Sequence, residues 1–307
     1  MNTKRNKTKG LVLLSGGLDS ILAIKVLQKQ DIDVTGISFV SYFFNADLAK
    51  KAAKEIKANI KIVDFSIEHL NMVKNPSYGR GKTINPCIDC HLMMIRKAGD
   101  FLKKGEFDFI ATGEVLGQRP MSQNKQALDL IKEKSGLKGY LLRPLSAKLL
   151  EPTILEEKGL INRNKLLDIS GRSRKIQMSL AKKWGIKEYP SPAGGCILTD
   201  LQFSERLKEL FDHWPDCQGN DIQLLRLGRH FWVGDNKIVI GRNKEENDKI
   251  NKLKQKPASP AGGGDIIIEP KEFPGPTVLI RSKDKILEES LIKAKELIIK
   301  YSKKVKE

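Results

Sequence analysis

A short loop rich in serine and glycine is the first segment whose residue types suggest chemistry. The run 15–20 reads Ser-Gly-Gly-Leu-Asp-Ser, and it lies between an apolar run and a stretch with helical spacing. Two glycines let the backbone approach a ligand closely, and the free N–H groups at the start of a helix attract phosphate. Ser15 and Ser20 add hydroxyl groups, and Asp19 suits such a loop if it handles Mg²⁺ or organises the loop. The loop therefore predicts a site for a phosphate-bearing ligand.

Three of the four cysteines form a second candidate site. Cys87 and Cys90 have Cys-x-x-Cys spacing, and Cys196 follows two glycines much later in the chain. With His91 or Cys217 as a fourth ligand, they fit a structural zinc site, which prefers four protein ligands. A redox pair, or buried cysteines that only pack, are the other interpretations of these residues alone. Four cysteines in 307 residues do not make a disulfide scaffold.

The elements that must position these residues alternate between strands and helices. Strand-like runs lie at 11–14, 34–40, 60–65 and 107–111, and helical spacing is found over 18–30, 46–58 and 86–104. This alternation predicts an α/β fold, a parallel sheet with helices on both faces. Ligands in such sheets bind beyond the carboxyl ends of the strands, where the loop at 15–20 and the residues after 111 are expected to lie.

The rest of the chain has shorter elements. Basic helices are expected over 163–168 and 173–184, another helix over 201–211, and a turn-rich segment at 215–220 indicates a domain boundary. Beyond it the pattern predicts strands at 222–225, 231–233, 237–240, 265–268 and 277–281, helices at 244–254 and 287–303, and a linker at 256–264. We therefore expect two domains, residues 1–212 and a small α+β module at 218–307.

Composition indicates a soluble protein with a polyanionic partner. Hydrophobic residues make up 40% of the chain and charged residues 30%, which excludes a disordered chain, a fibre and a membrane bundle. The net charge is +18, most of it in residues 1–210, so nucleic acid is the expected partner. No apolar run approaches the ~20 residues that a spanning helix needs. The expected location is the cytoplasm, without a membrane partner.

The loop at 15–20 resembles the pyrophosphate-binding loop, or PP-loop, of the N-type ATP pyrophosphatases. The resemblance implies a Rossmann-like fold that cleaves ATP to AMP and pyrophosphate, with Mg²⁺, and so adenylates a carbonyl oxygen that a nucleophile then displaces. The run 111–118, Ala-Thr-Gly-Glu-Val-Leu-Gly-Gln, looks like the segment after the fourth strand of 4-thiouridine synthases, although 119–121 depart from it. By this resemblance the ATP-binding residues are Ser15, Gly16, Gly17, Asp19, Ser20, Gly113 and Gln118.

The cysteines are similar to those of tRNA thiolases of the ThiI, MnmA and TtuA types. Members with two cysteines use one as a persulfide carrier and the other as a resolving thiol. The three-cysteine set resembles the iron–sulfur-dependent members, which implies that Cys87, Cys90 and Cys196 hold a [4Fe–4S] cluster with one iron open to sulfide. The same three cysteines and Asp19 are then the catalytic residues. The sulfur donor is sulfide or a persulfide-carrying partner protein.

Residues 221–307 resemble the RNA-binding domain of NFACT proteins. The matching features are a Gly-Arg-Asn-x-x-x-Asn-Asp run at 241–248 and a later Asp, Pro-Gly and Val-x-Ile-Arg series. The chain departs from the family at Ile267 and Glu269, where an aromatic residue and a histidine are common. The aligned candidates for RNA contact are Arg242, Asn243 and Arg281.

The sequence thus predicts an ATP-dependent tRNA uridine thiolase with tRNA as its partner. Two alternatives stay open: a PP-loop ligase that modifies RNA without sulfur chemistry, and a non-catalytic RNA-binding protein whose cysteines hold a structural metal. The C-terminal module would serve equally for dimerisation, so a homodimer is a further possibility.

Overall fold

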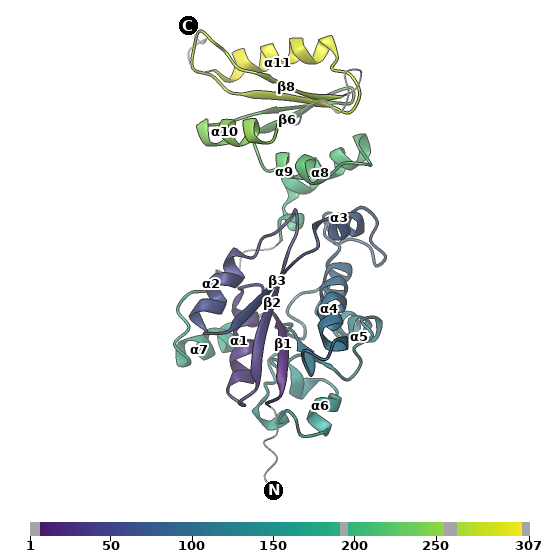
Figure 1. Cartoon of the computed structure of the whole chain (residues 1–307), viewed down its shortest axis with the longest axis vertical. Helices are drawn as coiled ribbons and strands as arrows, with labels where there is room; N and C mark the ends of the chain where they lie inside the picture. The colour runs from purple at the N-terminus through teal and green to yellow at the C-terminus, as the bar shows by residue number, and fades with distance from the viewer. Residues whose placement is uncertain (1–6, 191–195, 255–262, 303–307) are drawn as a thin grey trace. The chain divides into compact units, whose positions relative to one another are not determined.

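The computed structural model describes residues 7–190, 196–254 and 263–302 (Figure 1). The chain divides into two compact units, residues 1–196 and 197–307, and each has its own sheet. The functional domains expected at 1–212 and 218–307 stay a prediction. Among the described residues, no helix is both long and apolar enough to cross a membrane.

A parallel sheet of five strands forms the centre of the first unit, in the order β3-β2-β1-β4-β5. The strands are β1 (Lys9–Leu13), β2 (Asp33–Val40), β3 (Asn59–Asp64), β4 (Phe109–Ala111) and β5 (Leu141–Leu142). The strand order reverses between β1 and β4, which pair from Gly10 with Phe109 to Val12 with Ala111. Open α/β sheets bind ligands at the carboxyl side of such a reversal. The predicted fold class is confirmed, and the loops that follow β1 and β4 emerge side by side.

Helices cover both faces of this sheet (Figure 1). One face carries α1 (Leu18–Gln28), α2 (Asp47–Glu55) and α7 (Lys175–Lys183), and the other carries α4 (Cys87–Lys103) and α5 (Lys125–Lys134). Helix α3 (Ser66–Lys74) contacts α4, and the short α6 (Ile154–Glu157) follows the 3₁₀ turn η1 (Ala147–Leu149). Eight of the eleven residues of α1 are buried, as expected for a helix that is apolar on all sides.

Some details of the first unit differ from the sequence prediction. The helix expected over 163–168 is only a 3₁₀ turn, η2 (Arg163–Lys165), capped by the side chain of Asn162. Within residues 163–166 only Leu166 belongs to the core. A longer helix here would have no apolar face to bury, and so would gain no stability from packing. The sequence prediction did not include α3, α5 or the two-residue strand β5.

The second unit is an antiparallel sheet in the order β6-β7-β9-β8, with helices on both faces (Figure 1). Its strands are β6 (Arg229–Val233), β7 (Asn236–Ile240), β8 (Gly264–Ile268) and β9 (Val278–Ser282). Helix α11 (Glu288–Tyr301) packs on one face, and α9 (Gly219–Leu224) and α10 (Lys244–Lys252) pack on the other. The turn η3 (Ile197–Thr199) and helix α8 (Leu201–His213) come before α9 in the chain.

Alternation along β7 and β9 explains the two cores of this unit. Ile238 and Ile280 face α11, while Val239 and Leu279 face α9 and α10. The strand predicted at 222–225 is wrong, because these residues belong to α9 and the turn that follows it. The predicted linker at 256–264 lies mostly outside the described residues.

Candidate active site

The loop after β1 is shaped by a glycine that no other residue could replace without strain. Gly16 has a φ of +82°, and a Cβ on it would lie 2.4 Å from the backbone carbonyl carbon of Leu48, at the start of α2. This close approach, together with the left-handed backbone, requires glycine. The loop therefore turns sharply from β1 into α1 beneath the first residues of α2.

Two serines hold this turn together. Gly17 N donates to Ser15 Oγ at 3.2 Å, and Ser20 Oγ donates to Gly17 O at 2.7 Å. Gly17 is the N-cap of α1 and has no side chain with which to occupy the first N–H groups of the helix. The positive end of the helix dipole is thus left available to an anion, as the sequence predicted for a phosphate ligand.

Asp19 lies at the centre of a polar cluster that is only partly satisfied internally. Gln118 Nε2 donates to Asp19 Oδ2 at 2.7 Å, Gln177 Nε2 donates to Gln118 Oε1 at 3.2 Å, and an Arg174 nitrogen lies 3.8 Å from Asp19 Oδ2. Among the described residues, three buried atoms of this cluster have no hydrogen-bond partner: Asp19 Oδ1, Arg174 Nε and Gln177 Oε1. Buried polar atoms are rarely left unpaired, so these atoms indicate where a polar ligand belongs.

The cluster includes a residue that the sequence did not reveal. Gln177 is buried on α7 and is linked to Asp19 through Gln118, yet it looks like any polar residue of a basic helix. Arg174, just before α7, was equally compatible with a phosphate contact and with a solvated helix face. Only the packing of α7 against α1 brings both residues to the loop.

The residues after β4 connect this loop to the cysteine helix. A Cβ on Gly113 would lie 2.6 Å from Ser20 N, so the segment packs directly on the first turn of α1. The next residue, Glu114, accepts a hydrogen bond at 2.7 Å from His91 Nδ1, one residue beyond Cys90 in α4. Adjacent residues therefore contact the predicted nucleotide loop and the cysteine helix.

Glu114 is held as a buried carboxylate. Arg143 Nε donates to its Oε2 at 2.8 Å, and Thr112 Oγ1 donates to the same oxygen at 2.9 Å. Burial alone would raise the pKa of Glu114, but the charge of Arg143 and the hydrogen bond from His91 lower the pKa to about 2. Glu114 therefore fixes the His91 ring and, with it, the first turn of α4.

The low pKa of Glu114 leads to a stability prediction. Because its pKa falls from 4.5 to about 2 on folding, the ionised group stabilises the first unit fully above about pH 4.5, and this contribution is lost as pH falls toward 2. Glu114→Gln should lower the free energy of unfolding by about 3 kcal/mol at pH 7 and by about 1.5 kcal/mol at pH 3.

Urea denaturation followed by Trp184 fluorescence measures this difference. Glu68→Gln is the matched control, since Glu68 has an exposed ion pair with Lys97 and should change stability by less than about 1 kcal/mol. A difference between wild type and Glu114→Gln that does not depend on pH would contradict the prediction.

The two cysteines at the start of α4 each have a specific polar neighbour. Asn85 Nδ2 donates to Cys87 Sγ at 3.1 Å, and His69 Nε2 lies 3.0 Å from Cys90 Sγ. Asn85 is itself fixed by Thr83 Oγ1, which donates to its Oδ1 at 2.6 Å. Asp89 accepts the backbone N–H groups of residues 77 and 78, so the preceding loop is tied to the same helical turn.

The third cysteine lies near this pair. Burial raises the pKa of the Cys90 thiol well above its usual value, and the negative charges of Cys196, Cys87 and Asp89 raise it further. Cys196 is exposed, whereas Cys87 and Cys90 are half-buried. Cys196 thus lies close enough to Cys90 to interact with it electrostatically.

These thiols suit a soft metal or an iron–sulfur cluster in kind, because thiolates are the usual ligands of such clusters. Within 7–190, 196–254 and 263–302, however, no three His, Cys, Asp or Glu residues are arranged as a metal-binding group. Cys217, considered as a fourth zinc ligand, is buried in the second unit. A bound metal or cluster is therefore favoured by the type of ligand, three thiols, and not by an observed ligand geometry.

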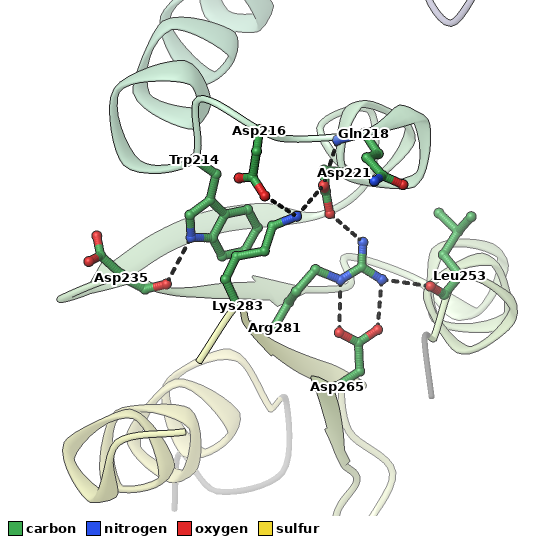
Figure 2. A network of polar contacts seen from close by, with 9 residues as sticks. All are labelled: Trp214, Asp216, Gln218, Asp221, Asp235, Leu253, Asp265, Arg281 and Lys283. Atoms are coloured by element: carbon green, nitrogen blue, oxygen red, sulfur yellow. Dashed lines mark hydrogen bonds and ion pairs between the residues drawn. The ribbon is translucent and has the colours of Figure 1, made fainter. Parts of the chain in front are cut away.

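The sequence suggested Arg281, in the second unit, as an RNA-contact residue. This is wrong, because the Arg281 side chain is buried away from solvent. It is 1% exposed, and its guanidinium donates to Asp265 Oδ1 at 2.8 Å, to Asp221 Oδ1 at 2.9 Å and to the Leu253 carbonyl at 2.7 Å (Figure 2). Asn243 caps α10 with its side chain. Arg242 is half-exposed and paired with Glu246, so it alone of the three candidates presents a cation at the surface.

Two family models match the chain. The tRNA methyl transferase HUP domain matches residues 8–183, and the NFACT protein RNA-binding domain matches residues 228–307. The first match covers the nucleotide loop, the segment after β4 and the Cys-x-x-Cys pair. The second covers all four strands of the antiparallel sheet.

Curated relatives are tRNA-modifying proteins. The chain is 27% identical over 228 residues to the tRNA-specific 2-thiouridylase MnmA of Karelsulcia muelleri, covering 68% of this chain and 55% of the relative. It is 32% identical over 143 residues to a probable tRNA sulfurtransferase of Finegoldia magna, covering 45% of this chain and 36% of the relative. The chain therefore spans only about a third to a half of the length of these relatives.

Solved structures with a related arrangement are more distant. A 4-thiouridine synthetase–RNA complex with bound ATP is 18% identical with a TM-score of 0.43, covering 71% of this chain and 52% of that one. The U34-tRNA thiolase NcsA of Methanococcus maripaludis, with its [4Fe–4S] cluster, is 18% identical with a TM-score of 0.33, covering 74% and 73%.

The fold with its strand reversal, the PP-loop at that reversal and a model match over residues 8–183 agree with one another. Because that match spans more than half of the 307 residues, the chain belongs to the tRNA methyl transferase HUP domain family.

Proposed function

We propose that the protein is an ATP-dependent tRNA uridine thiolase. The observation that carries this proposal is the junction at residues 113 and 114, where one residue packs on the PP-loop helix and the next holds the cysteine helix. A nucleotide site and a sulfur site that share one short segment suit a reaction in which ATP activates a base and sulfur then attacks it. The curated relatives, named as tRNA thiouridylases and sulfurtransferases, support the same substrate class.

The first half-reaction uses the loop after β1. ATP places its phosphates at the start of α1, where Gly17 leaves the N–H groups uncapped. The uridine carbonyl oxygen attacks the α-phosphorus, the bond to the β-phosphate oxygen breaks, and pyrophosphate leaves. Asp19 Oδ1, buried without a partner among the described residues, suits the Mg²⁺ ion that accompanies ATP.

The second half-reaction takes place at Cys87, Cys90 and Cys196. Sulfur at the sulfide oxidation level attacks the adenylated carbon, the carbon–oxygen bond breaks, and AMP leaves with the former carbonyl oxygen. We propose that the three thiolates hold a [4Fe–4S] cluster, which would offer an open iron site for sulfide. His69 and Asn85 orient two of the three sulfurs for this role.

The remaining residues bring the RNA to the site. Arg172 lies just before α7 and Lys175 at its start, near the predicted nucleotide site, and such cations supply most contacts to phosphate backbones. The target uridine leaves its stack to reach a site at the edge of a sheet. The NFACT-type module would bind the body of the tRNA, and its family is described as an RNA-binding domain.

Asp19→Asn tests the proposal. This substitution keeps the size of the side chain but removes the charge, so pyrophosphate release with tRNA and ATP should fall at least about a hundredfold. Thiouridine formation, measured by nucleoside mass spectrometry, should fall by the same factor, and tRNA binding should stay within about twofold of wild type.

Asp100→Asn is the control, because Asp100 is an exposed residue of α4 whose side chain pairs with Lys103 on the same helix. It should leave both rates unchanged. Pyrophosphate release without any thiouridine in the wild-type protein, under anaerobic conditions with sulfide, would favour a ligase without sulfur chemistry instead.

A further inference from the structure

His69 lies in a setting unusual for a histidine. The ring is 0% exposed and lies among three phenylalanines: it stacks on Phe65 at 4.8 Å and meets Phe44 and Phe43 edgewise at 5.2 and 5.5 Å. Burial lowers its pKa to about 4, so the ring is neutral at neutral pH. A polar ring fully enclosed by aromatic side chains costs free energy unless its nitrogens are used.

One nitrogen of this ring is used, and the atom it contacts is a sulfur. Nε2 lies 3.0 Å from Cys90 Sγ, while Nδ1 is buried with no hydrogen-bond partner among the described residues. The ring also contacts the aromatic side chains of Phe43, Phe44 and Phe65. Among the described residues, the Cys90 sulfur is therefore the polar atom with which the His69 ring nitrogens interact.

The position of the ring proton follows from these contacts. A neutral imidazole carries its hydrogen on one nitrogen only. A hydrogen on Nδ1 would be a buried donor with no acceptor, which native structures avoid more strictly than an unpaired acceptor. The hydrogen therefore belongs on Nε2, where it points at Cys90 Sγ and makes the sulfur the acceptor.

We propose that His69 is a positioning residue for sulfur transfer: its Nε2–H donates to Cys90 Sγ and fixes that side chain. This inference rests on the proposed function for its meaning but not for its test. Asn85 makes the corresponding hydrogen bond to Cys87: its Nδ2 donates to Sγ at 3.1 Å. The aromatic residues hold His69 rigidly, so the donor is in place before any sulfur arrives.

A pair of amide substitutions separates the hydrogen bond from the rest of the side chain. Glutamine places its amide nitrogen near the position of Nε2, and asparagine places it near Nδ1. Both are neutral and polar, so only His69→Gln keeps an N–H directed at Cys90. We would introduce each into a protein in which Cys87, Cys196 and Cys217 are serine, leaving Cys90 as the one thiol.

Methyl methanethiosulfonate is the probe. The Cys90 thiolate attacks its sulfenyl sulfur, a methyl disulfide forms, and methanesulfinate leaves with the electrons of the broken S–S bond. The rate depends on the access and the position of the attacking sulfur. His69→Asn should slow this reaction about tenfold, because the sulfur loses the hydrogen bond that holds it, and His69→Gln should stay within about threefold of the parent.

A second reporter protein keeps Cys87 in place of Cys90. Its rate should change less than about twofold with either substitution, because Asn85 serves that sulfur. Equal slowing by Gln and Asn, no slowing by Asn, or equal slowing of Cys87 would each overturn the proposal. If His69→Asn does not fold, His69→Phe replaces it with the same expected slowing, since it suits the aromatic surroundings.

The probe needs neither ATP nor tRNA. The assignment of His69 therefore stands or falls independently of thiouridine formation. A positive result with methyl methanethiosulfonate and no thiolated tRNA would leave the positioning role intact and remove the proposed function.

Discussion

Thiouridine formation is expected to fall at least about a thousandfold in Cys90→Ser, because the proposed sulfur site loses one of the three thiolates that hold it. Pyrophosphate release should stay within about threefold of wild type, because adenylation precedes sulfur attack and uses the loop after β1. The split between the two products is the informative result. It is measured by nucleoside mass spectrometry and a coupled pyrophosphate assay on the same samples, without oxygen.

Cys217→Ser is the matched control, since Cys217 is buried in the second unit and has no place in the proposed chemistry. Iron and acid-labile sulfide are measured on the same proteins. About four irons per chain in wild type and Cys217→Ser, lost in Cys87→Ser, Cys90→Ser and Cys196→Ser, would support a cluster. Normal thiouridine formation in all three single variants would refute the sulfur role of these cysteines.

Asp265→Ala is expected to lower the free energy of unfolding of the second unit by about 3–5 kcal/mol, because it leaves a buried guanidinium without its main partner. Arg281 is 1% exposed and forms paired hydrogen bonds with Asp265 at 2.8 and 2.7 Å (Figure 2). Asp221 remains as a partner but accepts only one Arg281 nitrogen, NH1. Urea denaturation followed by the fluorescence of Trp214 and Trp232 reports on this unit.

Two further variants make the result specific. Asp235→Ala removes an exposed carboxylate of the same unit, and should change stability by less than about 1 kcal/mol. Arg281→Met combined with Asp265→Ala removes the under-paired guanidinium, and should recover part of the loss, since Asp221 keeps Lys283 as a partner at 3.3 Å. A loss below about 1 kcal/mol in Asp265→Ala alone would show that the pair contributes little.

The arrangement of the first unit could be predicted because its signals are local. An apolar run followed by Ser-Gly-Gly and helical spacing already specifies a strand, a tight turn and a helix. The parallel pairing of β1 with β2 and β4 follows from this alternation. The same reasoning brought the loop at 15–20 and the residues after 111 to one edge of the sheet before any contact was known, whereas the grouping of the cysteines came from the resemblance to tRNA thiolases.

Other features depend on partners far away in sequence, and periodicity does not identify them. Arg281 looked like an exposed cation because nothing nearby reveals that Asp221 and Asp265 enclose it. The apolar residues at 222–225 suited a strand as well as a short helix, and packing against the sheet decided the outcome. Gln177 and His69 were missed because each looks like an ordinary helix residue until the helices pack.

The positions of the site residues along the chain also determine the order in which they are synthesised. The connection from β3 to β4 crosses the sheet from one half to the other, and it carries Cys87 and Cys90. During synthesis these cysteines leave the ribosome before Glu114, which holds their helix, and long before Cys196 at the end of the first unit. The complete set of thiols exists only after residue 196 has been translated, so a group that all three proposed ligands hold can be loaded only after that point.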